Sequence, residues 1–275
     1  MWYIYILTDG DLMKKKIILF ITFVFKKMGI GLERFEILES YKQTDMDIKN
    51  ILSKPNEELT YLLPYIKKSK SQLKQDLFVL SELKMQTNGF FVEFGATNGI
   101  DLSNTFLLES YFNWTGILAE PAKCWHKSLK KNRSSFIEHK CVWENSNIEI
   151  QFNETIDPVY STISKFNSLD YHALHRKHWF QYIVKTISLL DLLEKYDAPK
   201  VIDYLSIDTE GSEYKILKAF DFSKYQFRII TCEHNYHKNR KKIYKLLKNK
   251  GYSLKYSGLS RWDDWYVKDS INIIQ

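Results

Sequence analysis

The sequence has few cysteines: Cys124, Cys141 and Cys232 are the only ones among 275 residues, and no two of them form a C-x-x-C pair. A disulfide framework or a cysteine-rich zinc site needs closely spaced or more numerous cysteines, so their scarcity argues against both. It also fits a reducing compartment, and we therefore expect a cytoplasmic protein.

The sequence also lacks an apolar run that could cross a bilayer near its start. KKKIILFITFVFKK (14–27) holds nine largely apolar residues between lysine clusters, whereas a spanning helix needs about 20. No small-residue cleavage site follows before Lys26 and Lys27, which argues against a signal peptide. Two interpretations stay open. The segment is either held at the inner face of the membrane by its lysines, or packed on the domain as a helix or strand.

Charge and hydrophobic content are those of a folded protein. Hydrophobic residues make up 44% of the chain and charged residues 27%, enough to bury the core of one large domain. The net charge of +7 suits an anionic lipid surface, a nucleic acid or an acidic glycan without selecting one. Nucleic acid is not expected, because no known motif accompanies the basic run at 237–251.

Residues 90–121, FFVEFGATNGIDLSNTFLLESYFNWTGILAEP, are typical of a strand–helix–strand unit that holds a nucleotide-like ligand. A short apolar strand leads into a turn with Gly95 and Gly99, and a second strand ends at Glu120. Glycines let the backbone approach a ligand that a Cβ would obstruct. Glu120 follows them by about 20 residues, where such units place the carboxylate that binds ribose hydroxyls.

The spacing of this turn distinguishes two ligands. A dinucleotide site has the pattern G-x-G-x-x-G, with a helix N-terminus facing the pyrophosphate. Here the pattern is E-x-G-x-x-x-G, with Glu93 two residues before Gly95. A carboxylate there repels pyrophosphate but suits a ligand with an ammonium and a sulfonium group, which favours S-adenosylmethionine (SAM). A tight turn in an ordinary α/β protein is the simpler alternative.

Strands and helices alternate from residue 90 onward, which predicts a mostly parallel, doubly wound α/β sheet. We expect strands at 90–95, 115–120, 135–142, 148–153, 201–207, 227–233, 252–257 and 263–268. We expect helices at 73–85, 103–112, 123–131, 188–196, 212–219 and 237–249. The last two strands follow each other without a helix, which predicts an antiparallel hairpin at one edge.

Two stretches depart from this rhythm. Residues 1–87 are expected to form an extension with a basic, apolar start and a helical remainder, before a catalytic domain at 88–275. Residues 154–183 fit no strand–helix alternation, and we expect an insertion there over the ligand cleft.

Two later strands carry polar residues at their carboxyl ends. VIDYLSIDTEGSEYKIL (201–217) contains Asp208 and Glu210 after a buried strand, and FRIITCEHN brings in His234. Ligands of open α/β sheets bind outside the carboxyl ends of the strands, so Asp208 should face the glycine turn. Asp208, or His234 as the side chain that titrates near neutral pH, is the expected general base. Glu210 is expected to orient the acceptor.

The residues after Glu210 have a structural interpretation. Ser212 is expected to cap the following helix, and Glu213 in its first turn favours the helix dipole. Asp208, Glu210 and Glu233 are also oxygen ligands of the kind that Mg²⁺ accepts. The sequence does not require these three acids to converge, so a divalent metal stays an alternative and is not the expected cofactor.

Three segments together resemble the FkbM family of SAM-dependent methyltransferases: FVEFGATNGIDLSNT, GILAEP and YLSIDTEGSEYKILKAFDF. The resemblance covers roughly residues 88–268. It implies a Rossmann-like class I methyltransferase fold and O-methylation of hydroxyls on sugars and natural products. It implies that the turn holds the methionine part of SAM, Glu120 the ribose, and the region of Cys141 and Val142 the adenine. The implied cofactor-binding residues are Glu93, Gly95, Ala96, Asn98, Gly99, Glu120, Cys141, Val142 and Asp208.

The sequence therefore predicts a SAM-dependent O-methyltransferase that acts on a sugar hydroxyl of a glycan, polysaccharide or glycolipid precursor. Two other classes stay open. One is a non-catalytic scaffold or trafficking module that keeps the fold. The other is an RNA methyltransferase, which only the basic charge suggests and which salt-dependent RNA binding would support.

Overall fold

The computed structural model describes residues 60–166 and 176–270. The chain divides into two units, Met1–Lys54 and Pro55–Gln275, and every described residue belongs to the second. The basic apolar segment 14–27 and most of the predicted extension lie outside the described residues, so their predictions stay open. In the part of the chain that is described, no helix has the length and apolar character of a membrane span.

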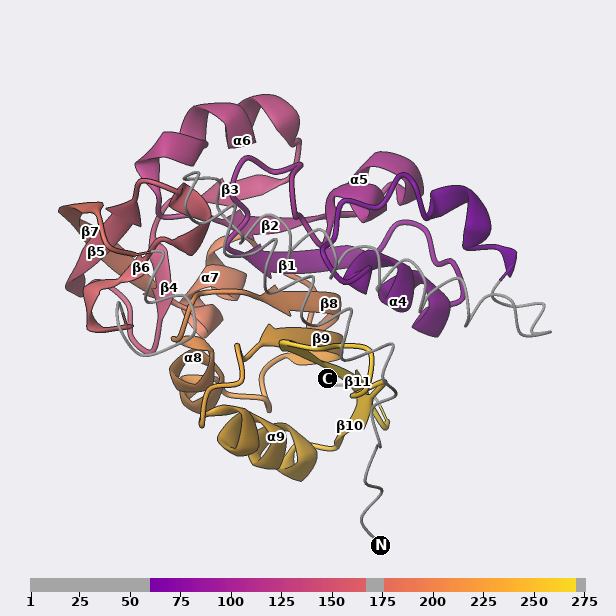
Figure 1. Ribbon diagram of the computed structural model, residues 1–275. Helices are drawn as coiled ribbons and strands as arrows, with labels where there is room; N and C mark the ends of the chain where they lie inside the picture. The colour runs from indigo at the N-terminus through magenta and orange to yellow at the C-terminus, as the bar shows by residue number, and fades with distance from the viewer. Residues whose placement is uncertain (1–59, 167–175, 271–275) are drawn as a thin grey trace, which may run out of the picture. The chain divides into compact units, whose positions relative to one another are not determined.

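A seven-stranded sheet forms the centre of this unit (Figure 1), in the order β10–β11–β9–β8–β1–β2–β3. Its strands are β1 (Phe90–Phe94), β2 (Thr115–Ala119), β3 (Phe136–Glu138), β8 (Val201–Ile207), β9 (Gln226–Glu233), β10 (Tyr252–Lys255) and β11 (Asp263–Lys268). Strands β9, β8, β1, β2 and β3 are parallel, and β11 is antiparallel to both of its neighbours. The predicted Rossmann-like α/β sheet and its antiparallel C-terminal hairpin are confirmed.

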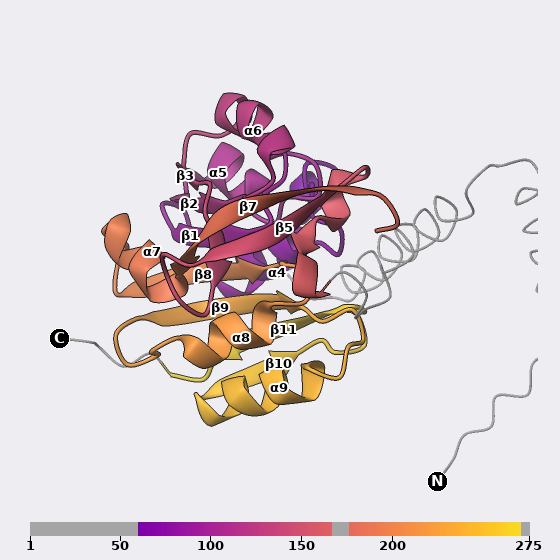
Figure 2. The same ribbon diagram turned by 90° about the vertical axis from the view of Figure 1, so that its left-hand side faces the viewer.

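Helices cover both faces of this sheet. They are α4 (Gln75–Glu82), α5 (Phe106–Phe112), α6 (His126–Asn132), α7 (Leu189–Lys195), α8 (Glu213–Ala219) and α9 (Arg240–Asn249). Apolar residues of α7, α8 and α9 pack in one core cluster with Val92 and Phe94 of β1, and Figure 2 shows α8 and α9 in front of the strands. Because side chains alternate along a strand, Phe91 and Glu93 face the opposite side. There the Arg133 guanidinium lies 5.4 Å from the centre of the Phe91 ring.

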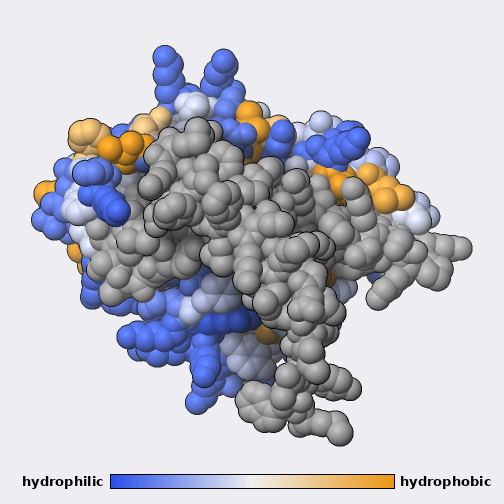
Figure 3. Space-filling view, in the orientation of Figure 1, coloured by the Kyte–Doolittle hydropathy of each residue, from blue (hydrophilic) through white to orange (hydrophobic). Residues whose placement is uncertain are grey.

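Helix α9 is a solvated surface helix, as its sequence indicates. Ile243 and Leu247 are buried in the core, and Leu246 packs against it. The lysines of α9 point to solvent, and Figure 3 shows a hydrophilic surface where Figure 1 places this helix. This division is the amphipathic pattern of a helix that lies on a sheet.

A second sheet of four strands, in the order β4–β7–β5–β6, was not predicted. Its strands are β4 (Cys141–Trp143), β5 (Glu149–Thr155), β6 (Thr162–Ile163) and β7 (Trp179–Ser188). The stretch 135–142, predicted as one strand, is two: β3 belongs to the large sheet and β4 to the second one. Strand β6 lies within 154–183 and β7 begins there, so the stretch expected as an insertion contributes two strands to the second sheet.

Candidate functional site

The carboxyl ends of four neighbouring parallel strands bring the predicted site residues to one edge of the sheet. Phe94 at the end of β1 lies opposite Ala119 of β2 and Ile207 of β8. Ile207 in turn lies opposite Cys232 of β9. The strands therefore end level with one another, and the residues that follow them, from Gly95 to Glu233, meet at this edge.

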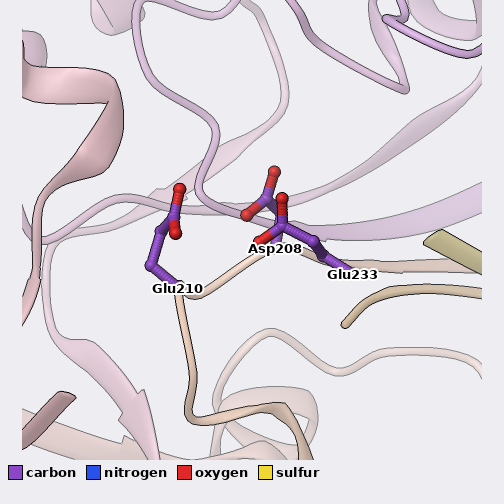
Figure 4. Close-up of side chains that lie close together, drawn as sticks. All are labelled: Asp208, Glu210 and Glu233. Atoms are coloured by element: carbon purple, nitrogen blue, oxygen red, sulfur yellow. The ribbon is translucent and has the colours of Figure 1, made fainter. Parts of the chain in front are cut away.

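Three carboxylates converge at the centre of the edge. One oxygen each of Asp208, Glu210 and Glu233 lies within 4.8 Å of the others, and Figure 4 shows the three groups side by side. Glu210 and Glu233 are buried and Asp208 is partly exposed. The sequence did not predict this convergence, because Glu233 comes from a different strand.

The carboxyl groups of Asp208 and Glu233 lie close enough to form a hydrogen bond when one of them is protonated. Burial, followed by the charges of Asp208 and Glu210, raises the pKa of Glu233 well above its usual range. Burial also raises the pKa of Asp208, while the hydrogen bond from Glu233 lowers it. We therefore place the proton on Glu233 and leave Asp208 as the carboxylate, the form that a general base requires.

The third acid is engaged by an arginine. Arg176 Nη2 donates to Glu210 Oε2 at 2.5 Å, and the Arg176 side chain is fully buried. The three acids are close enough together to hold a metal ion, and Arg176 already places a positive charge beside one of them.

The turn that carries Asp208 and Glu210 is held by Glu213. Its Oε1 accepts hydrogen bonds from the Thr209 and Gly211 backbone N–H groups at 3.2 and 2.8 Å. The structural interpretation of Glu213 is therefore supported. The expected cap by Ser212 is not formed, because its hydroxyl donates to Thr209 Oγ1 at 2.7 Å and makes no cap hydrogen bond.

The glycines of the first turn are required by contacts within the protein. Gly95 and Gly99 both have positive φ, +75° and +82°. A Cβ on Gly95 would lie 2.3 Å from the Asp208 carbonyl oxygen, and one on Gly99 would lie 2.6 Å from Arg133 Cγ. The reason differs from the one expected from sequence, which was ligand approach, and the cofactor contacts of both glycines stay predictions.

Two other predicted cofactor residues shape the same turn. Ala96 is fully buried, and its N–H donates to the Ala119 carbonyl at 3.4 Å. Asn98 Oδ1 accepts from the N–H groups of Ile100 and Asp101, both at 2.9 Å. Asn98 thereby closes the turn with its side chain, a local pattern that favours asparagine in loops.

Glu93 is buried against the segment that leads into α5. Its carboxylate accepts hydrogen bonds from the Asn104 N–H and the Thr105 hydroxyl, both at 2.6 Å, and from the Ser103 hydroxyl at 2.9 Å. In the structure Glu93 therefore holds the segment 103–105 onto β1. Its predicted contact with the methionine part of SAM stays a prediction.

Arg133, which sequence reasoning missed, completes this network from the end of α6. Its guanidinium donates to Thr105 Oγ1 at 2.8 Å and to Glu109 Oε2 at 2.8 Å, and it lies 3.7 Å from Glu93. Nothing in the local sequence indicates these partners, since Glu109 and Thr105 lie 24 and 28 residues away along the chain.

Replacing Arg133 with methionine should lower the free energy of unfolding by roughly 3–5 kcal/mol, because it leaves buried carboxylates without their cation. Urea denaturation of the variant measures this loss. Lys130→Met on the exposed side of α6 is the matched control and should change it by less than about 0.5 kcal/mol. Equal stability of the two variants would show that Arg133 does not hold the turn.

Glu120 lies buried at the end of β2 and contacts two backbone groups. Its oxygens accept from the Thr97 N–H at 2.9 Å and the Ala122 N–H at 2.8 Å. Burial raises its pKa to about 7, against these two hydrogen bonds. Burial, then the charge of Glu120, raises the pKa of the nearby Cys141 thiol to about 12. Cys141 and Val142 are themselves buried in β4.

One ring nitrogen of His234 accepts a hydrogen bond from the backbone. Its Nδ1 accepts from the Tyr236 N–H at 3.0 Å, so a neutral ring carries its hydrogen on Nε2. Nε2 is buried, 3.6 Å from Asp264 Oδ1. A base would need a free lone pair on Nε2, so this arrangement favours Asp208 as the base.

Comparison with known proteins finds a family model that covers more than half of the chain. A family model described as Methyltransferase FkbM domain matches residues 93–254. A search of curated proteins found no relative. Two similar solved structures are a precorrin-6y C5,15-methyltransferase from Geobacter metallireducens GS-15 and a human methyltransferase 10 domain containing protein. The first is 12% identical, with 66% of this chain and 71% of that chain covered and a TM-score of 0.34. The second is 13% identical, with 72% and 82% covered and a TM-score of 0.38.

Proposed function

This chain belongs to the FkbM methyltransferase family, and from that premise we propose that it uses SAM to methylate a hydroxyl group. The acceptor that we propose is a sugar in a glycan, polysaccharide or glycolipid precursor. SAM, when bound, supplies a methyl group on a positively charged sulfur.

The excess of negative charge at the sheet edge is the observation that carries this proposal. Asp208, Glu210 and Glu233 converge there, and Glu120 lies at the end of the next strand but one. Arg176 offsets Glu210 and a proton offsets Glu233, which leaves the charges of Asp208 and of ionised Glu120. The chain as a whole carries +7, so the negative charge is local. A site of this kind favours a cationic ligand such as SAM over a pyrophosphate.

The strand order suggests how cofactor and acceptor are arranged. The glycine turn and Glu120 follow β1 and β2, while Asp208 and Glu233 follow β8 and β9 on the other side of β1. We place the cofactor over β1 and β2 and the acceptor over β8 and β9. Asp208 then lies between the two, where the methyl group must pass.

The chemical role of the acids follows from their protonation. A sugar hydroxyl is a poor nucleophile while it keeps its proton. Asp208, as the carboxylate of the pair, would accept that proton as the hydroxyl oxygen takes the methyl group that SAM would supply. Glu233 donates its hydrogen bond to Asp208, and Glu210 is placed to orient the acceptor. The acceptor oxygen must lie about 3–3.5 Å from the methyl carbon.

The affinity for SAM should fall below pH 7. Ribose hydroxyls donate to an ionised Glu120, and its pKa is raised to about 7. Protonation removes the acceptor, so the dissociation constant should rise by up to about tenfold per pH unit below that value. Calorimetric titrations of SAM between pH 5.5 and 8.5 measure this. Glu120→Gln should bind more weakly with no such dependence; the same pH profile in both proteins would place the titration elsewhere.

Transfer of a tritiated methyl group from SAM tests the acceptor class. The purified protein is incubated with carbohydrate, lipid and RNA fractions from the host cell. We expect label in carbohydrate or glycolipid, released as methylated sugar on acid hydrolysis. Label in RNA alone would show that the protein is an RNA methyltransferase instead. SAM binding without transfer to any fraction would leave only the acceptor unidentified.

A further inference from the structure

The second sheet and the residues next to its strands contact the turn of Asp208 to Gly211 at three points. Thr162 Oγ1 of β6 donates to the Glu210 carbonyl at 2.9 Å. Phe166 lies beside Gly211, where an added Cβ would come within 3.1 Å of it. Arg176, just before β7, reaches the Glu210 carboxylate. This sheet is therefore built onto the turn that carries two of the three acids.

Arg176 is held by two backbone carbonyls in addition to its ion pair with Glu210. Its Nε donates to the Tyr160 carbonyl at 2.8 Å, and its Nη1 donates to the Phe166 carbonyl at 3.5 Å. The residue is only 1% exposed. Two backbone carbonyls therefore fix the orientation of this guanidinium. Because the group is planar, Nη2 is then directed at the Glu210 carboxylate.

The charge of Arg176 acts on more than one acid. It pairs with Glu210 at 2.5 Å, and its positive charge also favours the ionised form of Asp208. Carboxylates as close as those of Asp208, Glu210 and Glu233 repel one another unless a cation or protons lie among them. In many oxygen-ligand sites a divalent ion supplies that charge.

We propose that Arg176 is a positioning residue that takes the place of a divalent cation in the cluster of Asp208, Glu210 and Glu233. It holds Glu210 in the cluster as a carboxylate without a metal ion. The inference deepens the proposed function, because it assigns the counter-charge of the same site, yet its test does not depend on SAM binding. The second sheet then positions the Arg176 guanidinium against the acids at the edge of the large sheet.

Titration with Mn²⁺ tests the proposal, since Mn²⁺ accepts the same oxygen ligands as Mg²⁺ and its free form gives an electron paramagnetic resonance signal. Wild type should leave the free signal unchanged at micromolar to millimolar Mn²⁺. Arg176→Gln, which removes the charge but keeps a hydrogen-bonding side chain, should bind one Mn²⁺ at least about tenfold more tightly. The double variant Arg176→Gln, Glu210→Gln should lose this binding again, because one of the three carboxylates is gone.

Two further variants separate charge from fold. Arg176→Lys keeps the charge and should resemble wild type, and Lys177→Gln removes the neighbouring exposed charge and should have no effect. Tight Mn²⁺ binding by wild type would overturn the proposal, since the cluster would then be a metal site with Arg176 in place. A folded Arg176→Gln protein that binds no better than wild type would overturn it too. If Arg176→Gln does not fold, Arg176→Lys decides: it must remain as insensitive to Mn²⁺ as wild type, and gain of Mn²⁺ binding would contradict the role of charge.

SAM calorimetry on the same proteins keeps the two claims apart. Wild-type protein that binds SAM but also binds Mn²⁺ tightly would end the proposal for Arg176 and leave the methyltransferase proposal intact. Protein that binds neither would leave the counter-charge of the cluster as proposed and remove the SAM-dependent function.

Discussion

Asp208→Asn is expected to slow methyl transfer by about 10²- to 10⁴-fold, the contribution of a positioned general base. The amide keeps the shape of Asp208 but cannot accept the hydroxyl proton, and Glu233 loses the carboxylate to which it donates. The dissociation constant of SAM should rise by less than about tenfold, because the other acids of the edge remain. Transfer of tritiated methyl to the carbohydrate fraction measures the rate, and calorimetry the affinity.

Asp197→Asn is the matched control for this loss. Asp197 is exposed after α7, and asparagine tolerates its positive φ of 48°. This variant should transfer the methyl group at the wild-type rate. Normal turnover by Asp208→Asn would show that Asp208 is not the general base. His234→Ala then becomes the decisive variant, since a large loss of turnover there would restore the alternative base.

Gly95→Ala is expected to have the second large effect, on stability. The new Cβ would lie 2.3 Å from the Asp208 carbonyl oxygen, at a φ of +75°. Left-handed backbone costs a residue with a Cβ about 1–2 kcal/mol, and overpacking typically adds about 1–3 kcal/mol. The free energy of unfolding should therefore fall by roughly 2–5 kcal/mol in urea denaturation.

Gly258→Ala provides the comparison for this glycine. A Cβ there meets nothing within 4 Å, so its stability should change by less than about 1 kcal/mol. Because the clash in Gly95→Ala falls on Asp208 itself, SAM affinity should fall in the same variant. Equal stability of the two alanine variants would mean that β1 and β8 move apart at no cost, and that the close contact between the two turns is not required.

The first half of the site could be predicted because its signals are local. Gly95 and Glu120 belong to one strand–helix–strand unit, and a chain that must cross from β1 to its neighbour β2 fixes their spacing. Asp208 followed from a single buried strand and the rule that ligands bind at carboxyl ends. These inferences needed no knowledge of which strand lies beside which.

The rest depends on contacts between distant parts of the chain. Arg176 meets Glu210 across 34 residues, and Glu233 meets Asp208 from the next strand. A pattern of apolar and polar residues cannot indicate such pairs. Strand β7 was missed for a different reason. Its sequence, WFQYIVKTIS, is rich in aromatic and β-branched residues, which favour strands, so its composition could have revealed the strand.

The pairing of β5 with β7 holds the described part of the insertion, residues 154–166 and 176–183, beside the site. Seven residue pairs from Glu149↔Lys185 to Thr155↔Trp179 join the two strands. On their inner face, Phe152 and Val184 pack in a small core that includes Phe166. This core places Phe166 against Gly211, and it keeps the segment before β7 within reach of Glu210. The second sheet is thus tied to the acids by packing as well as by charge.

Calorimetric titration of SAM into the wild-type protein at pH 8 tests the central claim most directly, that the acid-rich edge of the large sheet binds a cationic methyl donor. We predict one SAM bound per chain, with a dissociation constant between about 1 μM and 1 mM, the range of ordinary enzyme substrates. Absence of binding at millimolar SAM, in protein that is folded by circular dichroism, would contradict the account.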